Sequence, residues 1–418
     1  MKKKVWIFNH YSGGMYKNQG GRHYWFAENL IKRGYDPTVF CASVLHNRDE
    51  KIDIEVGKYK RKTVDEIPFV FVETPEYDGN RVKRVNNMIQ FYRNLFPVSK
   101  EYSGEYGKPD IILASSVHPL TMVAGIKIAK KFGIPCICEV RDLWPESVVA
   151  YGILKKEGLV AKSLYKGEKW IYKNADSIVM TWEGGKDYII DQGWEDEVSL
   201  SKIEHISNGV VVDSFDRNSE EFIIEDEDLE NKDYKNIVYA GSIRKVNKLG
   251  MLLDAAKVIL DKGRDDIRFL IYGSGNEVDT LKQRCVDEGI SNVIFKGRVN
   301  KKYIPSILKK SYINILHNES TSLNKYGQSQ NKFFEYLASG RCVIQTYKTG
   351  YNIIERYNCG YVVQDQTPGN IAGVIMEAAD NEELTETMGE NAREAAHEFD
   401  FEKLTDKLID VIENTEQL

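Results

Sequence analysis

Residues 329–344 combine the side chains best suited to chemistry with elements that could position them. The segment starts with polar residues, continues as a predicted short helix up to Gly340, and ends as an apolar strand at Cys342–Ile344. Glycine ends helices because it enters the left-handed region without strain. Lys332 and Glu335 are three residues apart, so both can project from the first turn on one helix face. There a glutamate could accept hydrogen bonds from sugar hydroxyls and a lysine could bind phosphate, although a surface ion pair has the same spacing.

Other candidate residues follow predicted strands in the second half of the chain. Ligands of doubly wound sheets bind outside the carboxyl ends of the strands. A glycine there lets a nucleotide approach the backbone, and arginine or lysine can neutralise a diphosphate. These loop residues are Gly241, Arg244, Lys245 and Lys248 after Asn236–Gly241, Gly273 after Ile267–Tyr272, and Arg298 and Val299 after Val293–Phe295.

The first half of the chain has comparable loops. His118 follows the predicted strand Asp110–Ala114 and precedes a proline suited to the first turn of a helix. A charged cluster follows the strand Ile134–Val140. A glycine pair precedes a helix predicted over Arg22–Arg33. The residues of the last two groups are Arg141, Asp142 and Glu146, and Gly20 and Gly21.

The elements that must position these residues alternate between strands and helices. This alternation predicts parallel sheets covered by helices on both faces, an α/β fold with two doubly wound, Rossmann-like domains facing a cleft. We expect domains over residues 1–208 and 236–395 and a linker over residues 209–235. A final helix over residues 396–418 could cross back to the first domain.

Composition sets limits on partners and location. The chain has 418 residues and a formal net charge of −6, which disfavours nucleic acid as a partner. No apolar run approaches the roughly 20 residues of a membrane span. The six cysteines form no C-x-x-C pair, and Cys136 and Cys138 are expected to be buried thiols, in keeping with a reducing cytoplasm. The segment Asp226–Asp228 is interpreted as solvated linker, and no histidine cluster has the spacing of metal ligands.

Residues 329–344 resemble the donor-site motif of GT-B glycosyltransferases of family 4, a retaining group that builds bacterial polysaccharides. The resemblance implies that Glu335 binds the ribose of a nucleotide. It implies that the basic turn, through Lys245 above all, contacts the diphosphate. The loops at Gly273 and at Arg298 and Val299 would then wall the nucleotide. The family pattern has a further glutamate where this chain has Gly327.

The segment Arg141–Glu146, with the sequence Arg-Asp-Leu-Trp-Pro-Glu, resembles a capsule and O-antigen subgroup of fucosaminyltransferase type. In that subgroup the segment lies by the acceptor. The resemblance implies that Asp142 orients the acceptor hydroxyl or accepts its proton, and that Arg141 or Glu146 holds a polar acceptor group. It also implies that His118 contacts the transferring sugar and that the Gly20–Gly21 loop lies near the diphosphate or the acceptor.

The resulting hypothesis is retaining transfer from a nucleotide diphosphate sugar, such as a UDP-N-acetylhexosamine, to a saccharide or lipid-linked saccharide, without a cofactor or metal. A UDP-sugar 2-epimerase shares the architecture, but the segment Arg141–Glu146 counts against it. A non-catalytic nucleotide-sugar-binding subunit is compatible with Gly327. The basic and apolar segment Arg81–Phe96 could contact the inner face of the plasma membrane as an amphipathic helix, although such a stripe can equally be core.

Overall fold

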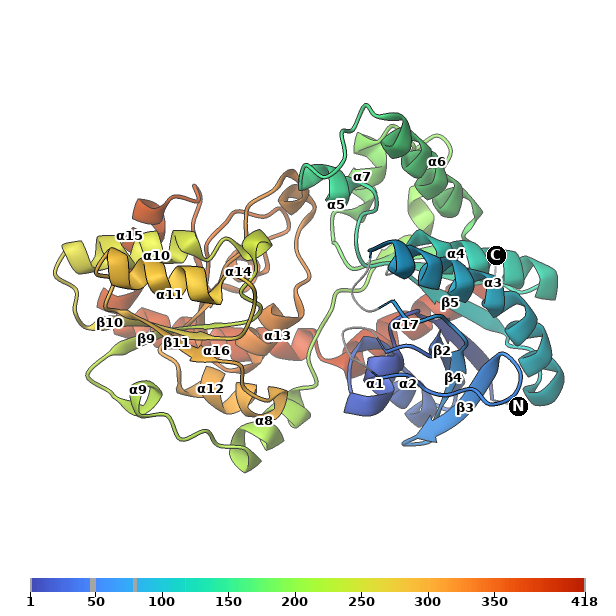
Figure 1. Cartoon of the computed structure of the whole chain (residues 1–418), viewed down its shortest axis with the longest axis horizontal. Coiled ribbons are helices and arrows are strands. Elements are labelled where there is room, and N and C mark those ends of the chain that lie inside the picture. Colours follow the sequence, from blue (N-terminus) through green and yellow to red (C-terminus); the bar gives the residue numbers. More distant parts are fainter. Residues whose placement is uncertain (1, 46–49, 78–80, 117, 417–418) are drawn as a thin grey trace. The chain divides into compact units, whose positions relative to one another are not determined.

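The computed structural model describes residues 2–45, 50–77, 81–116 and 118–416. The chain divides into two compact units (Figure 1). Unit 1 comprises Met1–Ser207 together with Phe401–Leu418, and unit 2 comprises Asn208–Asp400. The division falls within the segment His205–Val210.

Within its described residues, unit 1 has a sheet of eight strands in the order β3-β4-β2-β1-β5-β6-β7-β8. All neighbouring strands are parallel except β3 and β4. The strands are β1 Lys4–Phe8, β2 Asp36–Ala42, β3 Tyr59–Val64, β4 Ile67–Val72, β5 Ile111–Ser115, β6 Cys136–Val140, β7 Ser177–Met180 and β8 Ile203–His205. The helices are α1 Gly13–Asn18, α2 Arg22–Lys32, α3 Arg81–Tyr106, α4 Pro119–Phe132, α5 Glu146–Ala150, α6 Leu159–Asn174, α7 Gly185–Asp191 and α17 Phe401–Glu416, with the 3-10 helix η1 Leu200–Lys202.

The described part of unit 2 has a parallel sheet of six strands in the order β11-β10-β9-β12-β13-β14. The strands are β9 Lys235–Ala240, β10 Ile267–Tyr272, β11 Val293–Gly297, β12 Ile313–Leu316, β13 Cys342–Gln345 and β14 Gly360–Val362. The helices are α8 Val212–Glu221, α9 Glu227–Glu230, α10 Gly250–Asp261, α11 Val278–Asp287, α12 Ile304–Lys310, α13 Asn331–Ala338, α14 Ile353–Tyr357, α15 Pro368–Asp380 and α16 Glu382–Glu398. The 3-10 helices are η2 Lys245–Asn247, η3 Lys301–Tyr303 and η4 Ser322–Tyr326.

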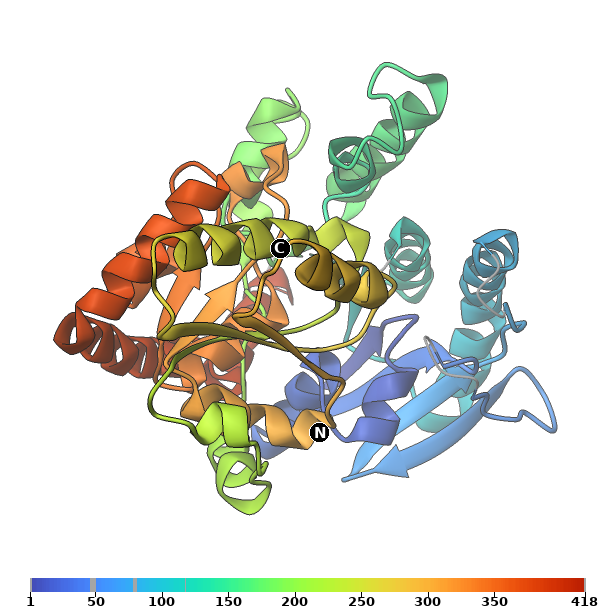
Figure 2. The same ribbon diagram turned by 60° about the vertical axis from the view of Figure 1, so that its left-hand side comes forward.

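Alternation along β9 explains why helices cover both faces of the unit 2 sheet. Successive strand side chains point to opposite faces. Ile237 and Tyr239 enter the core shared with α10 and α15, whereas Val238 and Ala240 enter the core shared with α12 and α13. Figures 1 and 2 show α10 and α11 on one side of this sheet and α12 on the other. The prediction of two doubly wound α/β sheets is therefore confirmed, and so is the burial of Cys136 and Cys138.

The segment Asp226–Asp228 is not the solvated linker that its charge run suggested. The Asp226 side chain is only 6% exposed and forms an ion pair with Lys296 at 2.7 Å. It also accepts hydrogen bonds from Tyr272 Oη (2.7 Å) and from the first turn of α9, which it caps. A charge run in sequence cannot reveal that one carboxylate has a lysine and a helix N-terminus as partners.

Candidate functional site

Glycines at the carboxyl edge of the unit 2 sheet let the loops after β9, β10 and β11 touch one another. The backbone N–H of Gly241 donates to Tyr272 O at 2.9 Å, and that of Gly273 donates to Gly297 O at 2.8 Å. A Cβ on Gly273 would lie 1.8 Å from Gly241 O, and its φ of +152° already favours glycine. The loops predicted to wall a nucleotide thus meet at one edge of the sheet.

Lys332 lies at the second position of α13 and reaches the same edge. Its Nζ donates to Tyr239 Oη at 3.3 Å and lies 4.3 Å from the centre of that ring. A Cβ on Gly241 would lie 3.4 Å from Lys332 Nζ, so the ammonium group sits against the loop after β9. Burial lowers the pKa of Lys332 to about 7. A phosphate group placed here would restore the charge of this lysine.

Glu335 is the fifth residue of α13 and therefore lies at the start of the second turn, whereas the sequence suggested the first turn. Its carboxylate is 19% exposed and forms an ion pair with Lys301 at 2.5 Å. The Lys301 side chain is 71% exposed, so a ligand could displace it at small cost. Lys301 follows β11, and no local sequence signal marked it as the partner of Glu335.

The basic turn after β9 is held by asparagines rather than by its cations. Ser242 donates to Asn247 Oδ1 at 3.1 Å, and Asn247 Nδ2 donates to Asn318 Oδ1 at 3.0 Å. Arg244 and Lys245 are exposed and form no ion pair with any other residue that the structure describes. Both are therefore available to an anion.

Lys248, the third cation of that turn, already has a carboxylate partner. It forms an ion pair with Glu319, which follows β12. His317 precedes this glutamate and contacts the Lys248 carbonyl oxygen at 3.1 Å and Thr346 Oγ1 at 2.7 Å. Sequence reasoning missed the polar end of β12, although the rule for strand carboxyl ends would have found it.

Arg298 and Val299 follow β11, as predicted. Arg298 is exposed, whereas Val299 is partly buried against the core that contains Phe333 of α13. The loop before α13 is fixed separately, because Asn208 donates to Ser329 Oγ at 2.7 Å and to Ser329 O at 2.6 Å. The first residue of unit 2 is thus hydrogen-bonded to the loop that leads into α13.

Gly327, at the position where the family pattern has a glutamate, ends η4 with a φ of +101° and a ψ of −160°. This conformation is strained for any residue with a side chain. A glutamate at position 327 would therefore be strained in the loop conformation of this chain.

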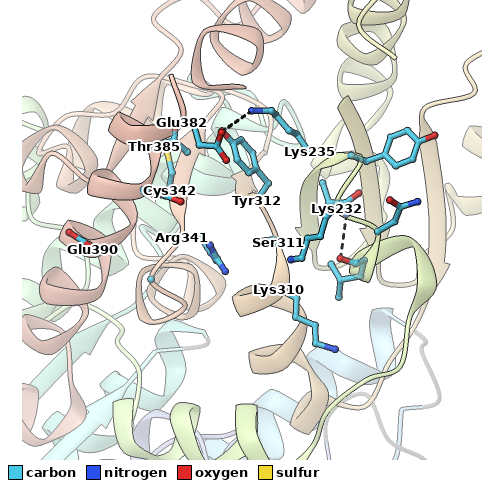
Figure 3. A pocket seen from close by; sticks show the side chains of 16 residues that line it. Lys232, Lys235, Lys310, Ser311, Tyr312, Arg341, Cys342, Glu382, Thr385 and Glu390 are labelled. Carbon is cyan, nitrogen blue, oxygen red and sulfur yellow. Dashed lines mark hydrogen bonds and ion pairs between the residues drawn. The ribbon is translucent and has the colours of Figure 1, made fainter. Parts of the chain in front are cut away.

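A pocket of about 610 Å³ lies at the opposite edge of the same sheet (Figure 3). It is lined by Lys235 at the start of β9, Tyr312 just before β12 and Cys342 at the start of β13. Lys235 and Glu382 face each other across it at 4.0 Å. Because the loops of the preceding paragraphs follow the other ends of these strands, this pocket is separate from the candidate donor site.

In unit 1, His118 forms a buried pair with a second histidine. His10 Nδ1 and His118 Nε2 are 2.8 Å apart, and the ring of His10 stacks on Phe91 of α3. Burial and, secondarily, the charge of Arg84 lower the pKa of His118 to about 4, so this imidazole is neutral at pH 7. His118 Nδ1 is buried without a hydrogen-bond partner among the residues that the structure describes.

The charged residues that follow β6 differ in their exposure and in their contacts. Asp142 is exposed, whereas Arg141 is half-buried and its Nε has no hydrogen-bond partner within the described ranges. Glu146 begins α5 and is occupied by structural contacts. It accepts hydrogen bonds from Tyr165 Oη (2.5 Å) and Gln192 Nε2 (3.4 Å). The Glu146 carboxylate therefore has partners within the protein, and its position can be explained without contact to an acceptor.

The loop at Gly20 and Gly21 leads into a buried network that sequence reasoning missed. Gly21 has a φ of +117°, and Arg22 then begins α2. Arg22 Nε donates to Glu139 of β6 at 2.7 Å, and His23 Nε2 contacts the same carboxylate at 2.8 Å. Burial alone would raise the pKa of Glu139, but Arg22 and His23 hold it well below its usual range.

Arg22 extends this network to the end of the first segment of unit 1. Its guanidinium also donates to Ile206 O (2.9 Å) and Ser207 O (2.5 Å) just after β8. The loop after β1 and the ends of β6 and β8 are therefore held together through one buried arginine.

The apolar stripe predicted on the segment Arg81–Phe96 is largely core. Phe91 and Leu95 of α3 are fully buried, and Lys131 lies 5.1 Å from the centre of the Phe96 ring. Among the described helices, none combines the length and apolar character that a membrane-spanning helix needs. No group of three or more metal-ligating side chains occurs in the described ranges.

Two family models match the chain. The model described as "Glycosyltransferase Family 4" matches residues 24–214, and the one described as "Glycosyl transferases group 1" matches residues 220–395. An uncharacterized glycosyltransferase of Methanocaldococcus jannaschii is 24% identical over 358 residues, covering 82% of this chain and 88% of that protein.

Solved structures share the fold at low identity. Sucrose-phosphate synthase from Thermosynechococcus elongatus has a TM-score of 0.72 and 15% identity, with 99% of each chain covered. HepE from Anabaena in complex with UDP-glucose has a TM-score of 0.65 and 12% identity, with 98% of this chain and 99% of that chain covered. The two sheets thus have the GT-B fold.

Proposed function

Because the chain belongs to the group 1, family 4 glycosyltransferases and has their GT-B fold, we propose that it transfers a sugar from a nucleotide diphosphate sugar to a hydroxyl group with retention of configuration. The observation that carries the proposal is the carboxyl edge of the unit 2 sheet. There, Gly241 and Gly273 let the loops after β9 and β10 pack against each other, while Lys332 and Glu335 approach the same edge from α13.

The donor side of the proposal assigns a role to each group at that edge. Glu335 binds the ribose hydroxyls once Lys301 is displaced. The loops at Gly273 and at Arg298 and Val299 wall the nucleotide. Arg244, Lys245 and Lys332 neutralise the diphosphate. The ion pair between Lys248 and Glu319 makes Lys248 the weaker candidate for phosphate contact.

The chemistry follows from stabilising the leaving group. As the bond between the anomeric carbon and the diphosphate oxygen breaks, negative charge grows on that oxygen, where positioned cations are most effective. The departing oxygen then takes the proton of the attacking hydroxyl on the same face of the sugar. This route uses neither a carboxylate nucleophile nor a metal ion.

Unit 1 is proposed to handle the acceptor. We propose that His118 contacts the transferring sugar, and a neutral imidazole brings no positive charge to the site. Asp142 is exposed and can orient the acceptor hydroxyl, whose proton passes to the departing diphosphate oxygen. The Gly20–Gly21 loop, which Arg22 holds in place, supports the acceptor side of unit 1. Arg141 holds a polar group of the acceptor.

For the donor we propose a UDP-sugar, such as a UDP-N-acetylhexosamine, and for the acceptor a saccharide or lipid-linked saccharide of capsule or O-antigen synthesis. The solved complex of HepE with UDP-glucose supports the nucleotide. The resemblance of the segment Arg141–Glu146 to capsule and O-antigen enzymes supports the pathway.

The test is a panel of UDP-, GDP-, ADP- and dTDP-sugars in a thermal-shift assay, because a ligand that binds only the folded state raises its melting temperature. At a hundred times Kd the stabilisation is about 2.7 kcal/mol, which is several degrees for a unit of this size. Binders are then incubated without acceptor. Slow hydrolysis to free sugar with the starting anomeric configuration is expected, whereas conversion of a UDP-N-acetylhexosamine to its 2-epimer, or no reaction with any donor and acceptor tried, contradicts the proposal.

A further inference from the structure

The pocket at the amino ends of the unit 2 strands takes no part in the proposed function. Its volume of about 610 Å³ is in the range of pockets that hold small molecules. Its walls come from the turn between α9 and β9, from the residues that precede β12 and β13, and from α16 (Figure 3). Because ligands of doubly wound sheets bind at the carboxyl ends of the strands, the sheet topology alone does not account for a pocket at the other edge.

Two cations of this pocket are available to a ligand. Arg341 precedes β13 and is half-buried, and its Nε donates to Lys309 O at 2.8 Å, which fixes the guanidinium group. Lys232 is exposed in a turn held by a hydrogen bond from Asp233 N to Asn231 Oδ1 at 2.9 Å. Neither cation forms an ion pair with another residue that the structure describes. Figure 3 shows Arg341 and Lys232 on opposite sides of the pocket, where both can meet an anion.

The other two cations of the pocket already have partners. Lys310 forms an ion pair with Glu230 at 2.6 Å. Lys235 donates to Ala379 O at 2.6 Å and lies 4.7 Å from the centre of the Tyr312 ring. These contacts hold the walls in place before a ligand binds, and a preformed site binds at a lower cost in entropy.

The wall that α16 contributes is acidic. Glu382, Glu386 and Glu390 line the pocket at intervals of four residues, so they share one face of the helix. Like charges at this spacing destabilise a helix, so helix stability does not explain the row. Glu382 lies 4.0 Å from Lys235, whereas Glu386 and Glu390 make no ion pair in the described part of the chain. Ionised carboxylates only accept hydrogen bonds, and hydroxyl groups are suitable donors to them.

We propose that this pocket binds a sugar phosphate. The phosphate group lies against Arg341, whose planar guanidinium group suits two parallel hydrogen bonds to phosphate oxygens, and Lys232 adds positive charge from the opposite side. The sugar hydroxyl groups donate hydrogen bonds to Glu382 and Glu386. A polyphosphate fits less well, because the carboxylates of α16 would repel it, and a neutral sugar would leave both cations without a partner. The inference goes beyond the proposed function, because the donor loops lie at the other edge of the sheet.

The experiment is calorimetric titration of the full chain with glucose 6-phosphate, N-acetylglucosamine 1-phosphate, glucose and inorganic phosphate, each with and without saturating UDP. At least one of the two sugar phosphates should bind equally well in both conditions, and glucose and inorganic phosphate should each bind at least about tenfold more weakly. Arg341→Gln should weaken sugar phosphate binding by about 10- to 100-fold, because hydrogen bonds to a charged group are lost. Lys232→Gln should weaken it by about threefold, because this lysine is exposed.

A further variant separates the sugar from the phosphate. Glu382→Ala/Glu386→Ala should weaken sugar phosphate binding by about tenfold, because it removes the acceptors of the hydroxyl groups. The same variant should leave the affinity for inorganic phosphate unchanged or raise it, because two negative charges are removed from the wall of the pocket. Binding of inorganic phosphate as tight as that of the sugar phosphates would overturn the role of α16.

The matched control is Lys282→Gln on α11, which replaces an exposed lysine of unit 2 outside the pocket and should change no affinity. Lys232→Gln removes no ion pair within the described residues and should keep the melting temperature, so it tests the site even where Arg341→Gln destabilises unit 2. All variants should keep their affinity for UDP, and the arms without UDP test this site independently of the donor site. Loss of sugar phosphate binding in saturating UDP overturns the proposal, as do unchanged affinities in both Arg341→Gln and Lys232→Gln, or no binding of either sugar phosphate at millimolar concentration.

Discussion

Glu335 is a half-buried carboxylate whose only ion-pair partner within the described ranges, Lys301, is an exposed side chain on another loop. Glu335→Ala should weaken UDP binding by roughly 10- to 100-fold, because hydrogen bonds to a charged group contribute about 1.5–3 kcal/mol. Transfer should be lost while the melting temperature changes little. Calorimetric titration with UDP measures the effect. Lys301→Ala is the control and should change affinity only slightly, and unaltered UDP affinity in Glu335→Ala would remove this residue from the donor site.

We expect Lys332 to make nucleotide binding depend on pH. Its pKa of about 7 in the free protein rises when a diphosphate binds, so binding takes up a proton above pH 7. This group therefore leaves affinity unchanged below pH 7 and lowers it as pH rises, by up to about tenfold per unit. UDP titrations at pH 7, 8 and 9, in buffers of different ionisation enthalpy, would measure both effects. Lys332→Arg stays charged and should lose the dependence, whereas a wild type with flat affinity across this range would contradict the assignment.

Part of this residue chemistry could be predicted from sequence. Lys332, Glu335, Gly241, Gly273 and Lys245 all follow predicted strands or open a predicted helix, and these are local signals. Their partners could not be predicted, because each contact joins residues far apart in sequence. The contact of Lys332 with Tyr239 and the pairing of Glu335 with Lys301 depend on the order of strands in the sheet. The chain pattern does not encode that order directly.

At the scale of elements, the turn between β3 and β4 shows why one part of the unit 1 sheet escaped prediction. Its two residues, Asp65 and Glu66, both have positive φ, at 47° and 65°. Such two-residue turns usually carry Asn-Gly or Asp-Gly, so Asp-Glu gave no hairpin signal. The edge strand β3 is also rich in charged residues, as edges often are, which hides its strand periodicity. Strands β5, β6, β9, β10, β11 and β13 are apolar runs bounded by loops, and their positions were predicted to within a few residues, whereas the buried strand β4 was not predicted.

The contact between the loops after β9 and β10 depends on Gly273. Gly273→Ala places a Cβ against Gly241 O and should lower the free energy of unfolding of unit 2 by about 1–3 kcal/mol. It should also weaken UDP binding, because the loop after β9 must move. The control is Gly373→Ala in α15, where an added methyl group meets nothing within 4 Å and should be neutral or slightly stabilising. Equal melting temperatures and UDP affinities for the two variants would show that the glycine contact is unimportant.

For the whole molecule, charge balance during transfer should come from protein cations alone. Arg244, Lys245 and Lys332 lie at the carboxyl edge of the unit 2 sheet, where we propose that the diphosphate binds. We therefore expect transfer or donor hydrolysis to continue at an unchanged rate in excess chelator. A rate assay with and without EDTA measures this, with a nucleotide-sugar enzyme of known metal dependence as the positive control for chelation. A loss of rate that magnesium restores would require a metal bound with the diphosphate.

The stability of unit 1 depends on α17, because this last helix belongs to unit 1 although the whole of unit 2 precedes it in the sequence. Phe401, Leu404, Leu408 and Ile412 of α17 are buried, and Phe401 packs on Phe26 of α2 with ring centres 5.3 Å apart. Burying four such side chains contributes about 6–12 kcal/mol, which matches the whole stability of an ordinary domain. The helix also carries Glu413, which forms an ion pair with Lys3 at 2.8 Å next to β1.

Truncation after Asp400 should therefore unfold unit 1 and leave the core of unit 2 intact. Differential scanning calorimetry of the full chain with UDP should show one transition that UDP raises, assigned to unit 2, and one that it leaves nearly unchanged. The truncated chain should lose the second transition and keep the UDP-sensitive one. The control Leu384→Ser, at an exposed position of α16, should affect neither. A truncated chain that retains both transitions would mean that α17 contributes little to unit 1, whereas loss of both would mean that the units do not unfold independently.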